Sequence, residues 1–481
     1  MKTAALHLLF VGIFLSLMGS SCRAQELPDR VIVGYWHNWT YPNGPTLAQL
    51  PEEFDVVNIS FAVPVIQLGA DMVFTPDPNI YPNPQDFLTD VQSLQASGRK
   101  VLISIGGGAD PVHVENANDQ AVFVSSMLDI MNTWGFDGID IDLEGSSLSL
   151  NGGDSDLSNP TTPRIVNFIQ AMQSLLAQLP ADTILTAAPE TAFVQGGASA
   201  YVGVWGAYLP VLDALRDDLD YVHVQHYNSG SMFGRDGQIY SPSTADFHVA
   251  MAECLLAGFN VAGGQYFAPL RSDQVAIGLP ASSSAAGSGY TPPATVKLAL
   301  DYLYLGKSFN GQYVLANSNG YPSFRGVMTW SINWDMFNND EFSTAYRDYF
   351  DQLFLDASTT SLSASAGGSL DLILKAGAGN AGRDFVVVGS ASGTTPGLPL
   401  PGGLVTLPIN RDNFTNRSYR QAGSSAFANF QGVLDSSGNA NAQFNMPPIS
   451  SSLVGTQLHF AFGLSNPWDF ASQPVMTTIT L

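Results

Sequence analysis

Short apolar segments recur at intervals through the first three quarters of the chain. Eight such segments can be counted. Several are continuous in Val, Ile and Leu, as strands buried on both faces must be, and helical patterns stand between them. The eight segments are residues 31–36, 56–63, 100–105, 138–143, 184–188, 221–225, 275–279 and 326–332. Eight strands that alternate with helices in this way predict an α/β fold, a closed (β/α)8 TIM barrel.

One of the intervening helices is signalled in detail. Thr162 suits the N-cap, Pro163 suits the first turn, and apolar residues follow at helical spacing until Pro180. Residues 119–134 and 295–305 also predict helices. The alternative fold is an open, doubly wound sheet, which usually carries a glycine-rich phosphate loop after its first strand. The aromatic-rich sequence at 34–39 stands there instead and favours the barrel.

The pattern changes near residue 355, where helical periodicity ends and Ser, Gly, Thr and Ala dominate. Alternating runs follow at 370–374, 385–388, 427–433, 440–444, 457–462 and 475–481, with turn-forming clusters between them. This is typical of an all-β sandwich. We therefore expect the barrel over residues 25–355 and a C-terminal all-β accessory domain over 356–481.

The N-terminus resembles a targeting signal. Lys2 precedes an apolar stretch too short to span a bilayer, and small residues follow up to Ala24. This predicts a signal peptide over residues 1–24 and a secreted, extracellular protein, with periplasmic or cell-surface placement left open. Loss of Cys22 with this peptide leaves Cys254 without a disulfide partner, and its apolar neighbours predict a buried thiol.

Acidic residues outnumber basic ones by 41 to 18, and the formal net charge is −23. Nucleic acids and anionic membranes bind clustered Lys and Arg, so this charge argues against both as partners. No Cys or His spacing in the sequence is typical of a metal site. We expect a monomer with a neutral partner, no membrane insertion, no metal and no cofactor.

The most informative segment is residues 137–144, Asp-Gly-Ile-Asp-Ile-Asp-Leu-Glu. Because side chains alternate along a strand, Asp140, Asp142 and Glu144 share one face at intervals of roughly 6–7 Å. The apolar residues between them pack on the helices, so the acids point into the barrel. Like charges in a confined interior predict that at least one carboxyl keeps its proton. Glu144 lies nearest the catalytic rim, where a protonated carboxyl serves as a general acid.

Two other interpretations of this acidic alternation are a solvated strand face and a calcium site. The strongly apolar intervening residues disfavour the first, and the straight spacing of a strand disfavours the second. The segment resembles the DxxDxDxE signature of glycoside hydrolase family 18, the chitinases and their relatives. Other segments resemble the family's first, second, third, sixth and eighth strands, in the expected order, over about residues 30–355. They contain Tyr35, Phe61, Ser104, Gly106, Gly107, Gln225, Tyr227, Asn228 and Trp330.

The resemblance implies substrate-assisted catalysis, in which the substrate's own acetamido group replaces a second catalytic carboxyl. Glu144 would protonate the leaving oxygen while the 2-acetamido carbonyl attacks the anomeric carbon and forms an oxazolinium ion. Water activated by Glu144 would then hydrolyse this ion with retention. Asp142 would hold the acetamido N–H, and Asp140 would share a proton with Asp142, steadied by Tyr35 and Ser104.

The remaining matched residues are expected to bind the substrate or to shape the cleft. Tyr227 would donate its hydroxyl to the acetamido oxygen, and Gln225 and Asn228 would face the sugar. Trp330 would form the apolar floor under the sugar ring, and Phe61 is assigned to substrate binding with a core position as its competing interpretation. Further expectations are that Gly106 and Gly107 shape the cleft and that Asp137 orients its strand.

Three features lie outside the matched motifs. Glu190 stands where many relatives carry Gln, and we expect it to adjust substrate contacts without catalysing. The interval 280–325 is too short to hold both a barrel helix and a tunnel-forming α+β insertion, which predicts a shallow groove and endo cleavage. In the tail, Trp468 is the best candidate for a surface aromatic, and most other tail aromatics are expected in the core.

The sequence therefore predicts a secreted chitinase that acts on chitin or N-acetylglucosamine oligosaccharides. One alternative is a related endo-β-N-acetylglucosaminidase that cuts the core of N-linked glycans, and another is a chitin-binding lectin on the same barrel. The segment 330–335 favours the polymer-cutting branch, and the presence of Glu144 favours an enzyme over a lectin.

Overall fold

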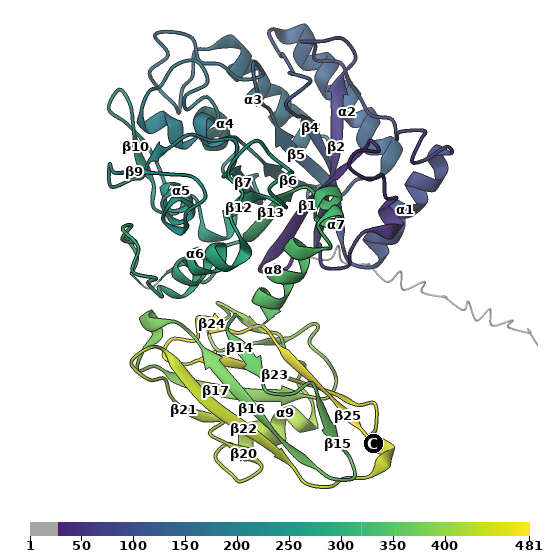
Figure 1. The fold of residues 1–481 in the computed structure, drawn as a ribbon, viewed down its shortest axis with the longest axis vertical. Coiled ribbons are helices and arrows are strands. Elements are labelled where there is room, and N and C mark those ends of the chain that lie inside the picture. Colours follow the sequence, from purple (N-terminus) through teal and green to yellow (C-terminus); the bar gives the residue numbers. More distant parts are fainter. Residues whose placement is uncertain (1–26, 319, 352) are drawn as a thin grey trace, which may run out of the picture.

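The structure is a computed structural model that describes residues 27–481 apart from 319 and 352. The predicted signal peptide over 1–24, with Cys22, lies outside the described residues. The chain folds into two bodies: a barrel ringed by helices, coloured purple to green in Figure 1, and a β-rich body below it, coloured green to yellow.

Eight parallel strands form the barrel. They run in the order β1-β13-β12-β7-β6-β5-β4-β2, and β2 pairs again with β1, which closes the sheet. Their bounds are β1 (Val31–His37), β2 (Val56–Pro64), β4 (Lys100–Gly106), β5 (Gly138–Asp142), β6 (Ile184–Ala187), β7 (Tyr221–Gln225), β12 (Val275–Pro280) and β13 (Gly326–Trp330). The TIM-barrel prediction is confirmed, and the open-sheet alternative is wrong. A buried cluster that includes Val33, Leu102 and Met328 lies inside the barrel.

Helices surround the barrel. They are α1 (Pro84–Ala96), α2 (Ala117–Trp134), α3 (Pro163–Leu176), α4 (Leu209–Ala214), α5 (Ala245–Ala257), α6 (Pro293–Leu305), α7 (Ile332–Phe337) and α8 (Glu341–Asp351). The three predicted helices are confirmed as α2, α3 and α6. Cys254 is buried in α5, as expected.

Two local details of this part differ from the sequence pattern. Thr162 is the N-cap residue of α3 and Pro163 begins the helix, as predicted, but the Thr162 hydroxyl donates to Asp154 Oδ2 over 2.7 Å and makes no capping hydrogen bond. The predicted strand 326–332 ends early, because Ser331 caps α7 by accepting a hydrogen bond from the Trp334 N–H. The barrel also carries β3 (Met72–Val73), the hairpins β8 (Met232–Phe233) to β9 (Ile239–Tyr240) and β10 (Phe259–Val261) to β11 (Gln265–Phe267), and short 3-10 turns at Leu47–Gln49, Thr191–Phe193, Gln195–Ala198 and Ser272–Gln274.

The second body is a β-sandwich, which confirms the predicted fold of the tail. One sheet has the order β14-β16-β22-β20, and the other has the order β15-β25-β23-β17-β21 with β24 paired to β23. The bounds are β14 (Leu355–Ala357), β15 (Ser361–Ser363), β16 (Gly368–Lys375), β17 (Asp384–Ser390), β18 (Leu398–Pro399), β19 (Thr406–Leu407), β20 (Phe427–Ala428), β21 (Gln431–Val433), β22 (Asn439–Met446), β23 (Gln457–Leu464), β24 (Phe470–Ala471) and β25 (Val475–Thr480), with 3-10 turns at Ala378–Asn380 and Ser451–Leu453.

The sandwich also departs from the sequence pattern. The predicted strand 427–433 is divided at Asn429, whose φ is 54°, so that β20 and β21 join different sheets. A helix that the pattern did not predict, α9 (Asn413–Arg420), is capped by Asp412, which accepts from the Thr415 N–H. Most tail aromatics lie in the core, as expected. Trp468 is half-buried and lines a cavity of about 290 Å³ together with the exposed Tyr419.

The two bodies meet at the N-terminal ends of the barrel strands. Arg30 precedes β1 and Arg325 precedes β13, and both line a cavity of about 460 Å³ with residues 404–406 and 469–471 of the sandwich. The sandwich therefore packs under the barrel end opposite the C-terminal rim, and it leaves that rim uncovered. None of the helices in the described parts of the chain has both the length and the apolar content of a membrane span.

Candidate active site

A row of acids rises through the barrel along β5. Asp140 and Asp142 point inward and are buried, while Ile139 and Ile141 pack in the core between strands and helices. β5 ends at Asp142, so Glu144 stands just beyond the strand at the C-terminal rim and is partly exposed. The geometry predicted from the alternation of side chains is the one observed.

Asp140 is the lowest acid in the row and is held by polar side chains from four other strands. Its Oδ2 accepts hydrogen bonds from the hydroxyls of Tyr35 (2.5 Å) and Ser104 (2.7 Å), and its Oδ1 accepts one from Thr186 (2.6 Å). Nε2 of His223 lies 3.1 Å from Oδ1. Burial raises the pKa of Asp140, but His223 and these hydrogen bonds outweigh burial and bring the pKa below its ordinary value. Asp140 is therefore a stable carboxylate.

The pKa of Asp142 is shifted in the opposite direction to that of Asp140. Burial raises its pKa well above the ordinary value, and the negative charges of Glu144 and Asp140 and a hydrogen bond with Glu144 raise it further. Asp142 therefore holds a proton that it shares with Glu144. Asp140, which the sequence analysis expects to share this proton, already accepts hydrogen bonds from the hydroxyl groups of Tyr35, Ser104 and Thr186.

Gln225 joins the two upper acids. Its Nε2 lies 3.0 Å from Asp142 Oδ1, 2.9 Å from Glu144 Oε1 and 3.0 Å from the Ala188 carbonyl. Gln225 is expected to face the sugar, and in this structure its amide nitrogen is engaged by the two carboxyls. Gln225 orients Asp142 and Glu144 relative to each other.

Two residues of the loop after β7, Tyr227 and Asn228, also belong to the site. Tyr227 is buried, and burial together with the charges of Asp142 and Glu144 raises the pKa of its hydroxyl well above the ordinary value. The hydroxyl therefore stays protonated and can donate. Asn228 has a φ of 49°, and its Oδ1 accepts a hydrogen bond from the Gly287 N–H over 2.9 Å. This contact ties the loop after β7 to the loop after β12.

Aromatic rings form a wall beside the acids. The rings of Trp330 and Phe61 are stacked, with centroids 6.0 Å apart and an interplanar angle of 13°. The ring centroid of Tyr35 lies 5.6 Å from that of Trp330. The rings of His37 and Trp39 extend the cluster, with centroids 4.8 and 6.2 Å from that of Trp330. Trp330 and Phe61 are both half-buried, which leaves part of the wall open to a ligand.

Two glycines allow this wall and the acid row to approach each other. Gly106 has a φ of +100°, and a Cβ there would lie 2.6 Å from the carbonyl oxygen of Asp142. Gly107 has a φ of +79°, and a Cβ there would lie 2.7 Å from the Phe61 ring. Its N–H donates to the Asp142 carbonyl over 2.7 Å. Only glycine fits either position without displacing neighbours.

Asp137 lies away from these groups at the start of β5. Its Oδ2 accepts hydrogen bonds from the Val101 N–H (2.8 Å) and from the Gln95 side chain (3.1 Å). These contacts fasten the beginning of β5 to β4 and α1, on the outer side of the barrel.

The site has a fourth acid at its rim. Burial and the negative charge of Glu144 raise the pKa of Glu190 to about 7. Its backbone forms a bridge with Gln225, which carries the contacts to both upper acids. Between β12 and β13, α6 is the only helix or strand among the described residues of 281–325, so no folded insertion covers the barrel rim there. No group of three or more His, Cys, Asp and Glu side chains in the described chain is placed to hold a metal ion.

Comparison with known proteins agrees with this geometry. Residues 31–302 match the family described as glycosyl hydrolases family 18. The chain belongs to this family. The match begins with β1 and ends within α6, so it includes the whole acid row and leaves out the sandwich.

Several chitinases are similar to about two thirds or more of this chain. Chitinase Chi52 of Paenibacillus xylanexedens is 51% identical over 327 residues, which cover 67% of this chain and 62% of the relative. Chitinase D of Niallia circulans is 48% identical over 360 residues, which cover 73% of this chain and 68% of the relative. The aligned part thus spans roughly two thirds of either relative. A crystal structure of a family GH18 chitinase from Chromobacterium violaceum is 37% identical, with a TM-score of 0.62, and it covers 69% of this chain and 86% of that chain.

The family 18 signature and its supporting segments come together in the barrel as one site. Sequence reasoning missed His37, Trp39, Thr186 and His223, which complete the wall and the surroundings of Asp140. The available signal was weak: Thr186 and His223 are single polar residues within apolar strands, and Trp39 belongs to an aromatic-rich stretch after the first strand.

Proposed function

We propose that this chain is a secreted chitinase that hydrolyses β-1,4 bonds between N-acetylglucosamine units. Residues 1–24 would be its signal peptide, 25–355 its catalytic domain and 356–481 its accessory domain. The observation that carries the proposal is the pairing of Asp142 and Glu144, both within 3.0 Å of Gln225 Nε2, beside an aromatic wall at the barrel rim. The names of the family 18 relatives support the substrate.

In the proposed reaction the sugar ring stacks on Trp330, and Glu144 lies beneath the glycosidic oxygen. The shared proton moves to Glu144 when Asp142 accepts a hydrogen bond from the substrate's acetamido N–H. Glu144 protonates the leaving oxygen as the C–O bond breaks, and the acetamido oxygen forms a new bond to the anomeric carbon. The resulting oxazolinium ion carries the positive charge.

The second half of the reaction regenerates the protein. Glu144, now a carboxylate, removes a proton from water, and the hydroxide oxygen attacks the anomeric carbon from the side the leaving group vacated. The bond to the acetamido oxygen breaks, and the sugar keeps its original configuration. The charge of Asp140 and Asp142 stabilises the cationic intermediate, and Tyr227 donates its hydroxyl to the acetamido oxygen.

Cleavage within the polymer fits the lack of an insertion at the rim. Because α6 is the only element between β12 and β13 in the described residues, no folded insertion there would force a chain end to enter first. A polymer can lie across such a rim at any point along its length. We therefore assign endo action.

The proposal predicts the behaviour of Glu144→Gln. This change keeps the shape and the contact with Gln225 but removes the proton donor, so kcat on N-acetylglucosamine oligomers falls by about 10²–10⁴-fold. Oligomer binding, measured by calorimetry, remains. Proton NMR of the wild-type products should show the β-anomer forming first, as retention requires.

Three substrates separate this function from its alternatives. The wild-type protein should cut chitin oligomers, should leave a glucose polymer that lacks acetamido groups intact, and should cut a high-mannose glycopeptide far more slowly. Normal hydrolysis by Glu144→Gln, or equal cleavage of the glucose polymer, would overturn the mechanism.

A further inference from the structure

The segment that carries Glu144 is not held by the barrel sheet. β5 ends at Asp142, and the chain turns at once, with Gly145 at a φ of +58° and the Ser147 N–H donating to the Glu144 carbonyl over 3.1 Å. A Cβ on Gly145 would meet no atom within 4 Å, so the outer side of the turn is open. Apart from the contact of its carboxyl with Gln225, the position of the proposed proton donor therefore depends on contacts made by residues 145–147.

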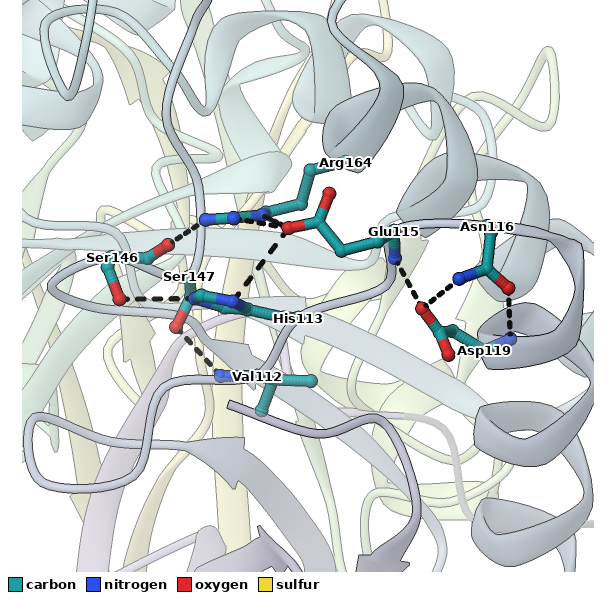
Figure 2. Close-up of polar contacts among 8 residues, drawn as sticks. All are labelled: Val112, His113, Glu115, Asn116, Asp119, Ser146, Ser147 and Arg164. Atoms are coloured by element: carbon teal, nitrogen blue, oxygen red, sulfur yellow. Dashed lines mark hydrogen bonds and ion pairs between the residues drawn. The ribbon is translucent and has the colours of Figure 1, made fainter. Parts of the chain in front are cut away.

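Three segments of the chain make those contacts (Figure 2). Arg164, in the first turn of α3, donates to the Ser146 carbonyl over 2.5 Å and to Glu115 Oε1 through Nε (2.7 Å) and Nη2. His113 Nε2 lies 3.1 Å from the Ser146 hydroxyl. The loop between β4 and α2, which carries His113 and Glu115, is thus joined through Arg164 to the turn after Glu144. We call Val112, His113, Glu115, Ser146, Ser147 and Arg164 the rim clamp.

The same loop also borders the carboxyl of Glu144. The Val112 N–H donates to the buried Ser147 hydroxyl over 3.1 Å, which fixes the loop to the turn a second time. Earlier in this loop, a Cβ on Gly108 would lie 2.9 Å from Glu144 Oε2, so the backbone of Gly108 is the wall against that oxygen. The rim clamp holds the carboxyl and its wall together as one unit.

We propose that Arg164 is a positioning residue for Glu144 and acts through the Ser146 carbonyl. This inference rests on the proposed function, because it assigns Glu144 the proton transfer. Arg164 is the residue that joins α3, the loop and the turn at one planar group. A guanidinium presents its donors in a rigid planar fork, whereas an ammonium is a compact charge on a flexible stem and fixes the geometry of its acceptors less well. A displacement of about 1 Å at a reacting group is enough to cost roughly 10²-fold in rate.

The ion pair of Arg164 with Glu115 is partly exposed, with side-chain exposures of 22% and 44%. Such pairs contribute little to global stability. A loss of activity without a loss of stability is therefore the signature that separates positioning from a structural role.

The chain offers a matched control. Arg216 also joins a carboxylate to backbone carbonyls, since it lies 3.1 Å from Asp213 Oδ1 and donates to the carbonyls of Pro269 (2.7 Å) and Ala268 (3.2 Å). Its side-chain exposure of 24% is close to that of Arg164. Arg216 touches neither the acid row nor the aromatic wall.

The experiment compares Arg164→Gln, Arg164→Lys and Arg216→Gln in the full-length protein, with the N-acetylglucosamine tetramer as substrate. We expect Arg164→Gln to lower kcat by about 10- to 100-fold with little change in KM, and Arg164→Lys to recover part of this loss. Arg216→Gln should leave kcat and KM unchanged, and both Gln variants should melt at similar temperatures. Equal kcat values for the two Gln variants would overturn the proposal.

A crystal structure of Arg164→Gln provides a second test that needs no activity. We expect the Ser146 carbonyl and the Glu144 carboxyl to move relative to Gly108 and Gln225. Unchanged positions would contradict the proposal. If the wild-type protein does not cut the tetramer, the proposed function fails, and the crystallographic comparison still decides whether Arg164 positions Glu144.

Discussion

Two aspartates of the same strand, Asp140 and Asp142, show how local surroundings separate identical side chains. Both are buried, but the pKa of Asp140 is lowered and that of Asp142 is raised. Hydroxyl donors and an imidazole surround the first, whereas the second faces two other acids. The proton therefore sits at the end of the row next to Glu144, where the proposed reaction uses it.

Glu190 gives a testable pH effect at this scale. Its pKa of about 7 means that it gains a negative charge as the pH rises through neutrality, and this charge is one of the causes that raise the pKa of Asp142. Glu190→Gln removes the charge, so the pKa of Asp142 falls and the shared proton is lost at a lower pH. We expect the alkaline limb of the profile of kcat/KM against pH to shift to lower pH by less than about one pH unit.

Aspartate at the same position serves as the control for this prediction, because it keeps a titrating charge. Glu190→Asp should leave the alkaline limb nearer its wild-type position. If the alkaline limb of Glu190→Gln stays at the wild-type pH or shifts to higher pH, Glu190 does not act on the shared proton.

The site depends on the backbone conformation at the end of β4. Gly106 combines a φ of +100° with a close approach to the Asp142 carbonyl, so any side chain there meets both strain and a clash. We expect Gly106→Ala to lower the free energy of unfolding by about 1–3 kcal/mol and to reduce kcat, because the clash moves Asp142. Urea unfolding and oligomer kinetics measure the two effects.

Gly135, which ends α2, separates strain from clash. Its φ is +65°, but a Cβ there would meet no atom within 4 Å. Gly135→Ala should therefore show strain alone, with a smaller loss of stability and an unchanged kcat. A normal kcat in Gly106→Ala would disprove the importance of this contact for the site.

For the whole molecule, the junction between barrel and sandwich centres on Phe354. Its ring lies 4.5 Å from the Arg30 guanidinium of the barrel and 5.3 Å from the Phe470 ring of the sandwich. The Phe354 N–H donates to Gln473 Oε1, and the Gln473 amide in turn donates to the Asp351 carbonyl. This fully buried ring joins the two bodies at the barrel end remote from the acid row.

We expect Phe354→Ala to cost about 3–5 kcal/mol, as the loss of a buried Phe does. The loss falls on the junction, so calorimetry should show the two bodies unfolding in separate transitions, while kcat on short soluble oligomers is unchanged. Phe444→Ala, within the sandwich core, leaves the junction intact and should lower the temperature of the joint transition without dividing it. A single unaltered transition in Phe354→Ala would mean that the bodies are not coupled through this residue.

The sequence by itself determined the barrel, the sandwich and the inward row of Asp140, Asp142 and Glu144, because strand alternation and apolar runs are local properties of a chain. It did not determine α9 or the division of 427–433, since the sandwich core selects those conformations. Nor did it determine which acid holds the proton. That choice depends on Thr186, His223 and Gln225, which closure of the barrel brings to β5 from strands distant in the chain, and electrostatic interactions depend on distances in space.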